Sequence, residues 1–323
     1  MWAMRAGGFS GYGDLALVDL PKPLLSEGRV LVRMTAAGVT PLDHTILSGQ
    51  YKKAKAPLVL GNEGAGVVEE GGGAEFPAGS RVMFTGLYGV AEDGTYGEWL
   101  AVRKQDLCVI PDGTDDASAA GIPVAYLTAL MSLSLTNFQA GKSVLAPAIG
   151  GSVGNAVTQV AHALGAKHAI SSTTNHAKAL EAQALGFTEV IDGSRETLGD
   201  GVRRITGGDG VDIVIDAIGG EIFSEALTTL APGGSVITLG YSAGRKTTID
   251  VTDVIWKAAT IRGFMLFAQP PALWQEAWKN IVRLLQSGGI KPIVAKTFPL
   301  AEAANALRYL VEERPFGRVV LAI

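Results

Sequence analysis

The sequence predicts an α/β protein in which a doubly wound parallel sheet is inserted into a split, β-rich unit. Three observations predict this class. Residues 1–120 carry short strands between glycine and proline turns, residues 121–266 alternate strands with helices, and residues 267–323 end in a further strand. We therefore expect one domain over 1–120, a second over 121–266, and a tail, 267–323, that rejoins the first.

The first region predicts a barrel-like β unit, because several short strands follow one another with turn residues between them. The strands are expected at Ala16–Asp19, Arg29–Ala37, Gly64–Glu69, Arg81–Thr85 and Tyr96–Val102.

The second region predicts a parallel sheet, because its strands are joined by helical crossovers. Helices are expected at Asn155–Leu164 and Ala177–Leu185. Such a sheet binds its ligand at the carboxyl ends of the strands. The six strands are expected at Ser143–Ala146, His168–Ser172, Glu189–Asp192, Asp212–Asp216, Ser235–Leu239 and Ile261–Leu266.

The tail mixes both kinds of element. The expected order is a helix, a strand, a helix and a strand, at Leu273–Gln286, Ile293–Phe298, Ala301–Glu312 and Arg318–Ala322.

The stretch Ala148–Gly154, with the sequence AIGGSVG, lies between an expected strand and an expected helix. The first N–H groups of a helix lack internal partners and attract a phosphate. Glycine at 151 and 154 would let the backbone approach a ligand and the helix pack on its strand. Ile149 stands where a GxGxxG pattern has its first glycine, so the motif alone indicates nucleotide binding only weakly.

The same stretch also matches a hydrolase nucleophile elbow, because Gly150, Ser152 and Gly154 form a GxSxG pattern. A hydrolase of that kind needs a general-base histidine far downstream. No histidine follows His176. The pattern is therefore interpreted as a nucleotide-binding turn.

The end of the second expected strand distinguishes between the two nicotinamide dinucleotides. Residues 171–175 read SSTTN, without the acid that usually binds the ribose of NAD, and Lys178 follows. A carboxylate about 4 Å from a 2′-phosphate would cost about 4 kcal/mol at an effective dielectric constant near 20. The sequence favours NADP; the alternative is a hydroxyl-rich turn with a solvated lysine.

Composition narrows the function classes. A net charge of -4 without a basic run disfavours nucleic acid as a partner. The single cysteine, Cys108, excludes an intrachain disulfide and a multi-cysteine metal site, and the N-terminal MWAMRAGG is no secretory signal, so a cytoplasmic protein is expected. The uncharged stretches Ala117–Gly141 and Ser143–Ala166 predict buried helices rather than membrane spans.

The order and spacing of several segments resemble the medium-chain dehydrogenase/reductase superfamily, and within it the zinc-free quinone oxidoreductase branch. The resemblance covers essentially the whole chain. It implies a Rossmann domain inserted in a split GroES-like barrel, and NADPH-dependent reduction of quinones or α,β-unsaturated carbonyl compounds in a cleft between the domains. The segments are Gly38–Asp43, Ser48–Tyr51, Gly61–Val68, Pro123–Ala129, Ala148–Gly154 with Gln159, Leu230–Gly234 and Gly317–Leu321.

Zinc-dependent members of the superfamily carry a cysteine and a histidine where this chain has Thr40 and Asn62. Because a threonine and an asparagine cannot build the usual three-ligand zinc site, we expect no metal, and a zinc alcohol dehydrogenase is disfavoured. A small-molecule acceptor that delocalises the charge left by hydride transfer is favoured. A non-catalytic NADPH-binding sensor remains an alternative.

The resemblance also assigns roles to residues. Thr40 and Tyr51 would lie at the substrate, with His44 as a further candidate proton donor, although Tyr51 and His44 can equally be packing residues. The edge strand Ile261–Leu266 would form a homodimer seam. The implied cofactor residues are Ala148, Gly151, Ser152, Val153 and Gly154 at the pyrophosphate, Ser172 and Lys178 at the 2′-phosphate, and Thr128, Ile218, Leu239, Phe264, Leu266 and Arg318 along the nicotinamide half.

Overall fold

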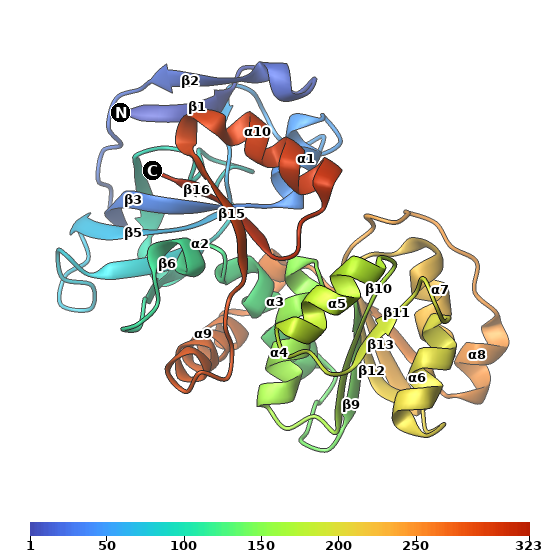
Figure 1. Cartoon of the computed structure of the whole chain (residues 1–323). Coiled ribbons are helices and arrows are strands. Elements are labelled where there is room, and N and C mark those ends of the chain that lie inside the picture. The colour runs from blue at the N-terminus through green and yellow to red at the C-terminus, as the bar shows by residue number, and fades with distance from the viewer. The chain divides into compact units, whose positions relative to one another are not determined.

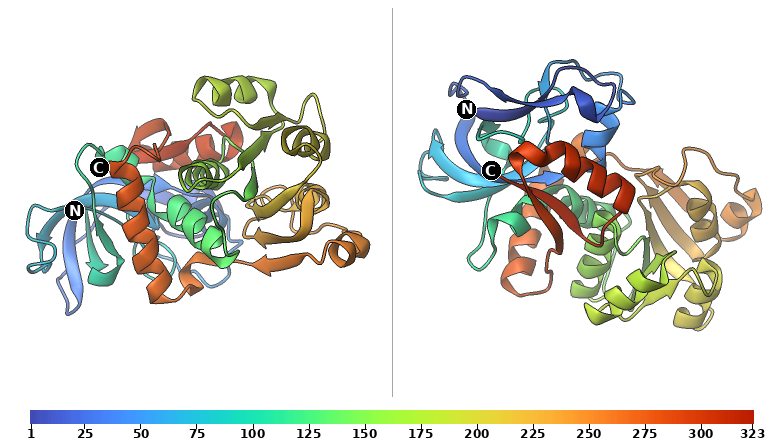
Figure 2. Two further views of the ribbon diagram at one scale, coloured as in Figure 1. Left: turned by 90° about the horizontal axis from the view of Figure 1, so that it is seen from below. Right: turned by 45° about the horizontal axis from the view of Figure 1, so that its top comes forward.

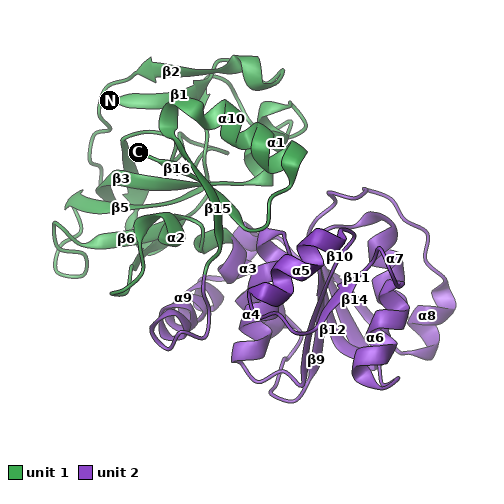
Figure 3. Ribbon diagram, in the orientation of Figure 1, with its two compact units in different colours: residues 1–124, 292–323 green, residues 125–291 purple.

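The computed structural model describes all residues from Met1 to Ile323, and these divide into two compact units (Figures 1 and 3). Unit 1 comprises residues 1–124 and 292–323, so both chain ends belong to it, and unit 2 comprises residues 125–291. Each unit has its own sheets and its own core, and the GroES-like and Rossmann architectures expected from the sequence are both present.

Unit 1 is built on a seven-stranded sheet with the order β15-β16-β3-β5-β6-β8, in which β7 also pairs with β3, and on a three-stranded sheet, β2-β1-β4. The strands are β1 (Trp2–Ala6), β2 (Leu15–Asp19), β3 (Arg29–Val39), β4 (Leu58–Val59), β5 (Glu63–Glu70), β6 (Arg81–Thr85), β7 (Trp99–Arg103), β8 (Leu107–Val109), β15 (Val294–Pro299) and β16 (Arg318–Ala322).

The long strand β3 supplies side chains to two core clusters. Val30 and Val32 pack with Phe84 and other buried residues in one cluster. Ala37 and Val39 belong to the other, which includes residues of β1, α1 and β16. The helices of this unit are short: α1 (Pro41–Leu47), α2 (Asp116–Ala120) and α10 (Ala303–Arg308).

Several features of unit 1 differ from the expectation. β1, β4 and α1 were not expected. The helix expected at Ala301–Glu312 is divided into a 3-10 turn, α10 and a π-helical turn, Tyr309–Glu313. Its apolar positions are spaced as in one helix, but that spacing does not reveal where the hydrogen-bond register changes.

Unit 2 contains a six-stranded parallel sheet with the order β11-β10-β9-β12-β13-β14. The order reverses between β9 and β12, and in open parallel sheets ligands bind outside the carboxyl ends of the strands at such a reversal. The strands are β9 (Ser143–Pro147), β10 (His168–Thr173), β11 (Val190–Asp192), β12 (Val211–Asp216), β13 (Leu230–Thr238) and β14 (Thr260–Gly263). β14 is shorter than expected, so Phe264 and Leu266 follow it rather than lie in it.

Helices cover both faces of this sheet, with α4 and α5 on one face and α6 and α7 on the other (Figures 1 and 2). None of the helices is long and apolar enough to cross a membrane. They are α3 (Pro123–Leu135), α4 (Ser152–Ala163), α5 (His176–Ala184), α6 (Leu198–Thr206), α7 (Gly220–Thr228), α8 (Val251–Trp256) and α9 (Pro271–Gln286).

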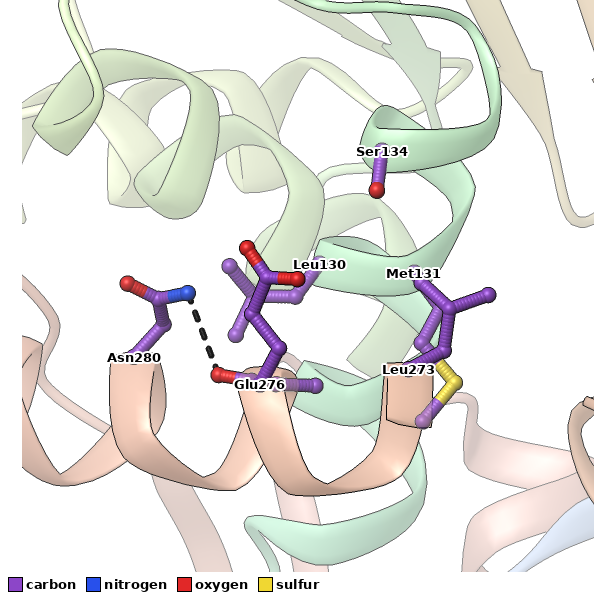
Figure 4. A pocket seen from close by; sticks show the side chains of 7 residues that line it. Leu130, Met131, Ser134, Leu273, Glu276 and Asn280 are labelled. Atoms are coloured by element: carbon purple, nitrogen blue, oxygen red, sulfur yellow. Dashed lines mark hydrogen bonds between the residues drawn. The ribbon is translucent and has the colours of Figure 1, made fainter. Parts of the chain in front are cut away.

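Helix α9 lies in unit 2, although the sequence placed it in the tail that begins at residue 267. It packs on α3, where Leu130 and Met131 face Leu273 around a cavity of about 30 Å³ (Figure 4). The amphipathic pattern of α9 predicts an apolar contact but does not say which helix provides it.

Candidate active site

The turn after β9 is held in one conformation by its main chain. Ala148 has a φ of 67°, in the left-handed region, and Gly151 donates its N–H to the Ala148 carbonyl at 2.9 Å. The N–H of Ile149 donates to the carbonyl of Ser172 at 2.9 Å, and the Ile149 side chain is buried. Because the left-handed residue is Ala148, no glycine is needed at position 149.

The two glycines that the sequence singled out serve different purposes. A Cβ at Gly154 would lie 2.4 Å from the Ala148 carbonyl oxygen and 2.5 Å from that of Pro147, so only glycine lets α4 begin this close to β9. At Gly151, which is exposed, the nearest atom would be the Ala148 oxygen at 3.3 Å. Gly151 therefore leaves its outer side open to a ligand.

Helix α4 directs unpaired amides into this turn. Its first N–H groups, those of Ser152, Val153 and Gly154, have no acceptor within the helix. Together with the open side of Gly151, these donors fit a pyrophosphate group.

The end of β10 lies next to this turn. Ser172 pairs in register with Pro147, and the carbonyl of Thr173 accepts the N–H of Gly193 at 2.8 Å. Asn175 caps α5 by accepting the N–H of Lys178 at 3.2 Å, which places Lys178 in the first turn of that helix. Hydroxyl groups and one ammonium group thus follow β10, and no carboxylate does.

An acid, Asp192, lies instead at the end of the neighbouring strand β11. Its Oδ1 accepts the Ser194 hydroxyl at 2.6 Å, its Oδ2 lies 2.6 Å from His176 Nδ1, and Arg195 Nε lies 3.4 Å from the same oxygen. The hydrogen bond from Ser194 and that with His176 lower the pKa of Asp192 to about 2. An acid at the end of β11 was not expected, because dinucleotide sites usually present their acid at the end of the second strand, which here is β10.

The remaining cofactor residues expected in unit 2 follow β12, β13 and β14. Leu239 donates its N–H to the carbonyl of Asp216, and Phe264 donates to that of Thr238, both at 2.9 Å. Ile218, Leu239 and Phe264 are partly exposed, and Leu266 is buried in a 3-10 turn. Thr128 lies on α3 and is buried. Apart from Thr128, these residues all follow the carboxyl ends of parallel strands, as the glycine turn after β9 does.

In unit 1, Thr40 begins α1 and belongs to a buried polar cluster around Asp43. Its N–H and hydroxyl both donate to Asp43 Oδ2 at 2.8 Å. The N–H of Gly61 and the hydroxyl of Tyr96 also donate to this carboxylate, at 3.1 Å each. Burial raises the pKa of Asp43, and these hydrogen bonds oppose the shift. Since the Thr40 proton points to Asp43, Thr40 can offer a lone pair to a ligand but not a proton.

His44 and Tyr51 are not hydrogen-bonded to this cluster. His44 Nδ1 lies 3.3 Å from the hydroxyl of Tyr12, and the two ring centroids are 5.7 Å apart. Tyr51 is half-buried against the core of unit 1, and its hydroxyl makes no hydrogen bond within the chain. Of the three residues proposed from the sequence, Tyr51 alone has a hydroxyl proton without an acceptor in the protein.

Arg318, which the sequence assigned to the nicotinamide half, is enclosed within unit 1. Its side chain is 6% exposed and forms an ion pair with Glu63, which is fully buried. Burial lowers the pKa of Arg318 to about 10, and the charge of Asp43 opposes this. Glu63 also accepts the N–H of Val124 at 2.7 Å. Burial of this kind depends on the tertiary structure, and no local pattern around Arg318 predicts it.

The donor groups of unit 1 do not suit zinc. Thr40 and Asn62 stand where the resemblance implies zinc ligands in the zinc-dependent members, and Thr40 Oγ1 lies 3.4 Å from Asn62 Oδ1. No group of three His, Cys, Asp or Glu side chains anywhere in the chain is placed to hold a metal ion. We therefore assign no catalytic step to a metal.

Comparison with known proteins identifies the families to which the two units are similar. Residues 26–112 match the model of the alcohol dehydrogenase GroES-like domain, and residues 152–287 match that of the zinc-binding dehydrogenases. A 2-haloacrylate reductase from Burkholderia is 32% identical over 91% of this chain and 90% of its own. The human quinone oxidoreductase is 29% identical over 100% of this chain and 98% of its own.

Solved structures share the fold over the whole chain. A mycobacterial protein complexed with NADPH is 28% identical, covers 100% of both chains and has a TM-score of 0.87. An NAD-dependent alcohol dehydrogenase is 29% identical with a TM-score of 0.90, also over 100% of both chains.

The fold and the glycine turn thus define a nicotinamide-dependent oxidoreductase. The chain belongs to the medium-chain dehydrogenase/reductase superfamily, in its quinone oxidoreductase-like branch.

Proposed function

We propose that this protein is an NADPH-dependent reductase of quinones or α,β-unsaturated carbonyl compounds that works without a metal. The observation that carries the cofactor assignment is the end of β10, where Ser172 and Lys178 occur and no carboxylate does. Asp192, on the next strand, has its charge compensated by Arg195 and by its hydrogen bonds. The names of the two relatives support the acceptor class.

Several residues would hold the cofactor. The amides of Ser152, Val153 and Gly154 would bind the pyrophosphate, and Ser172 and Lys178 the 2′-phosphate. The apolar residues that follow β12, β13 and β14 would enclose the nicotinamide, which supplies a hydride when bound. They are Ile218, Leu239, Phe264 and Leu266, and Thr128 would contribute from α3.

Tyr51 is the proton donor that the geometry favours. A quinone or an enone that accepts hydride at carbon develops negative charge on its oxygen, and a nearby hydroxyl stabilises that charge and then protonates it. The hydroxyl of Thr40 donates to Asp43, and His44 is engaged with Tyr12. The Tyr51 hydroxyl has no such partner, so it is available to a substrate.

Steady-state oxidation of NADPH tests this function. The purified chain should turn over phenanthrenequinone, benzoquinone or a simple enone, should prefer NADPH to NADH, and should keep its activity after treatment with a chelator. Binding of NADPH without turnover across this panel would instead identify a sensor. Loss of activity on chelation, with stoichiometric metal in the untreated protein, would identify a zinc enzyme.

We also propose that the protein is a homodimer. Strand β14 is an edge strand whose four residues are all exposed, and the neighbouring helix α8 exposes Ile255 (67%) and Trp256 (81%). An edge strand with unpaired main-chain groups, beside exposed apolar side chains, is a template for pairing with a second copy. Sedimentation velocity should show a dimer that Trp256→Glu disrupts and Leu24→Glu, on an exposed residue of unit 1, does not. A monomer at micromolar concentration would exclude this assembly.

A further inference from the structure

Asp216, the last residue of β12, has a carboxylate that the function proposed above does not use. It is 0% exposed. Its Oδ1 accepts the N–H groups of Ile218 at 3.0 Å and Gly219 at 2.9 Å, and its Oδ2 accepts the hydroxyl of Thr238 at 3.0 Å. A buried carboxylate is costly unless such hydrogen bonds compensate for the lost water. Here the carboxylate is fully engaged by main chain and side chain.

These bonds connect the loops that follow β12 and β13. Besides the Asp216 carboxylate, the N–H of Ala243 donates to the carbonyl of Ile218 at 2.9 Å. A Cβ at Gly240 would lie 1.9 Å from the carbonyl oxygen of Ala217, so the two loops touch through their main chains. Asp216 is therefore the anchor of a double loop rather than of a single turn.

The double loop lies at the carboxyl ends of the strands, where the glycine turn also lies. β12 pairs with β9, with Val214 opposite Leu145, so the carboxyl end of β12 adjoins the glycine turn that follows β9. β10, with its hydroxyl-rich end, pairs on the other side of β9. The anchored loops consequently flank the pyrophosphate turn on the side opposite the adenosine ribose, and they carry Ile218 and Leu239.

We propose that Asp216 is a positioning residue for hydride transfer, an inference that rests on the function proposed above. Its carboxylate fixes the loops that carry Ile218 and Leu239, and these side chains set the depth and the angle of the nicotinamide ring. The carboxylate itself contacts no reacting atom. In Asp216→Asn an amide NH₂ would replace one acceptor oxygen and face N–H or O–H donors, so part of the anchoring is lost while the size of the side chain is kept.

The same strand supplies a matched control. Asp212, near the amino end of β12, accepts the N–H of Ser143 through Oδ2 at 2.7 Å. Asp212→Asn alters a carboxylate that likewise accepts a main-chain N–H, at the opposite end of the sheet and in a half-buried position. For wild type and both variants we would measure kcat, the affinities for NADPH and for adenosine 2′,5′-bisphosphate, and the isotope effect on kcat with NADPH deuterated at C4.

We expect Asp216→Asn to lower kcat about 10- to 100-fold, because misplacement of a reactant by about 1 Å can cost that much. The isotope effect on kcat should rise, since hydride transfer becomes rate-limiting. Affinity for the bisphosphate, which lacks a nicotinamide, should stay within about twofold, because the adenosine half is bound elsewhere. Asp212→Asn should show none of these changes in kcat.

Thr238→Val removes a single bond to Asp216 and keeps the shape of the side chain, so it should lower kcat in the same direction by less. If Asp216→Asn does not fold, Thr238→Val tests the positioning role of Asp216 in its place. Unchanged kcat in the folded variants, an equal loss of bisphosphate affinity, or the same kinetic loss in Asp212→Asn would each overturn the inference. If wild type binds NADPH without turnover, only the proposed reductase activity is excluded. Weaker binding of NADPH, but not of the bisphosphate, by Asp216→Asn would then still support the role of Asp216 in positioning the two loops.

Discussion

The two units use their polar groups in opposite ways. At the carboxyl end of the sheet in unit 2, the first main-chain amides of α4 have no acceptor within the helix. Gly151 keeps the preceding turn open, and Gly154 lets α4 begin close to its strand. In unit 1 the polar side chains turn toward one another, as in the four bonds to Asp43 and the pair of Arg318 with Glu63. In unit 2, cofactor binding is inferred from the shape of the main chain at the glycine turn. In unit 1, acid–base chemistry would depend on the few side chains that have no partner in the protein, such as Tyr51.

The strongest test of this contrast is Gly154→Ala. Its new methyl group would overlap the carbonyl oxygens of Pro147 and Ala148, so α4 must move away from β9. We expect a loss of about 1 to 3 kcal/mol in the free energy of unfolding, as for other overpacked sites, together with loss of measurable NADPH binding. Denaturant unfolding and calorimetric titration measure the two effects.

Gly151→Ala is the matched control, because a methyl group there meets its nearest atom at 3.3 Å and otherwise faces outward. Its stability should stay within about 0.5 kcal/mol of wild type, as for surface substitutions, while NADPH binding weakens. If Gly151→Ala is the less stable of the two variants, the division of roles between these glycines is wrong.

Tyr51→Phe examines the group that unit 1 leaves unpaired. If its hydroxyl protonates the reduced acceptor, kcat/KM should fall about 10²-fold, within the range of general acid catalysis, without a change in fold. Tyr12→Phe, which removes the partner of His44, should leave kcat/KM unchanged. An unaltered kcat/KM in Tyr51→Phe would show that Tyr51 is a packing residue.

Lys178→Ala examines the cofactor preference of unit 2. Removal of one ammonium group from a phosphate site should raise KM for NADPH about tenfold and barely change KM for NADH, because only NADPH carries the extra phosphate. Lys167, near the amino end of β10, pairs with Asp209 at 3.4 Å, and Lys167→Ala should change neither constant. Equal effects of Lys178→Ala on both cofactors would contradict the assigned role.

The sequence predicted the periodic parts of the fold and the strand, glycine turn and helix around Ala148–Gly154. The core strands, the glycine turn and the hydroxyl-rich end of β10 all follow from local patterns. It missed α1, although Thr40, Pro41 and Asp43 form a capping box with proline at the first helical position. The enclosure of Arg318 by Glu63 could not be predicted, because the two residues lie far apart in the chain. The same holds for the bonds of Asp216 to Thr238 and of Asp192 to His176, whereas their bonds to Ile218, Gly219 and Ser194 are local.

The smallest expected effect concerns Asp192, the compensated acid of unit 2. Its folded pKa of about 2 lies below its ordinary value of 3.8, so its contribution to stability is complete above about pH 5 and is lost as the pH falls toward 2. Ser194→Ala removes the largest cause of this shift. The folded pKa of Asp192 should therefore rise toward the ordinary value, and the loss of stability on acidification should become shallower.

Carboxyl NMR titration of the folded protein measures the Asp192 pKa directly. Ser10→Ala, which removes the corresponding hydroxyl from Asp14, is the control: it should raise the pKa of Asp14 and leave that of Asp192 in place. A titration of Asp192 that does not change in Ser194→Ala would mean that the main-chain N–H of Ser194 and the hydrogen bond with His176, rather than the Ser194 hydroxyl, keep the pKa of this acid low.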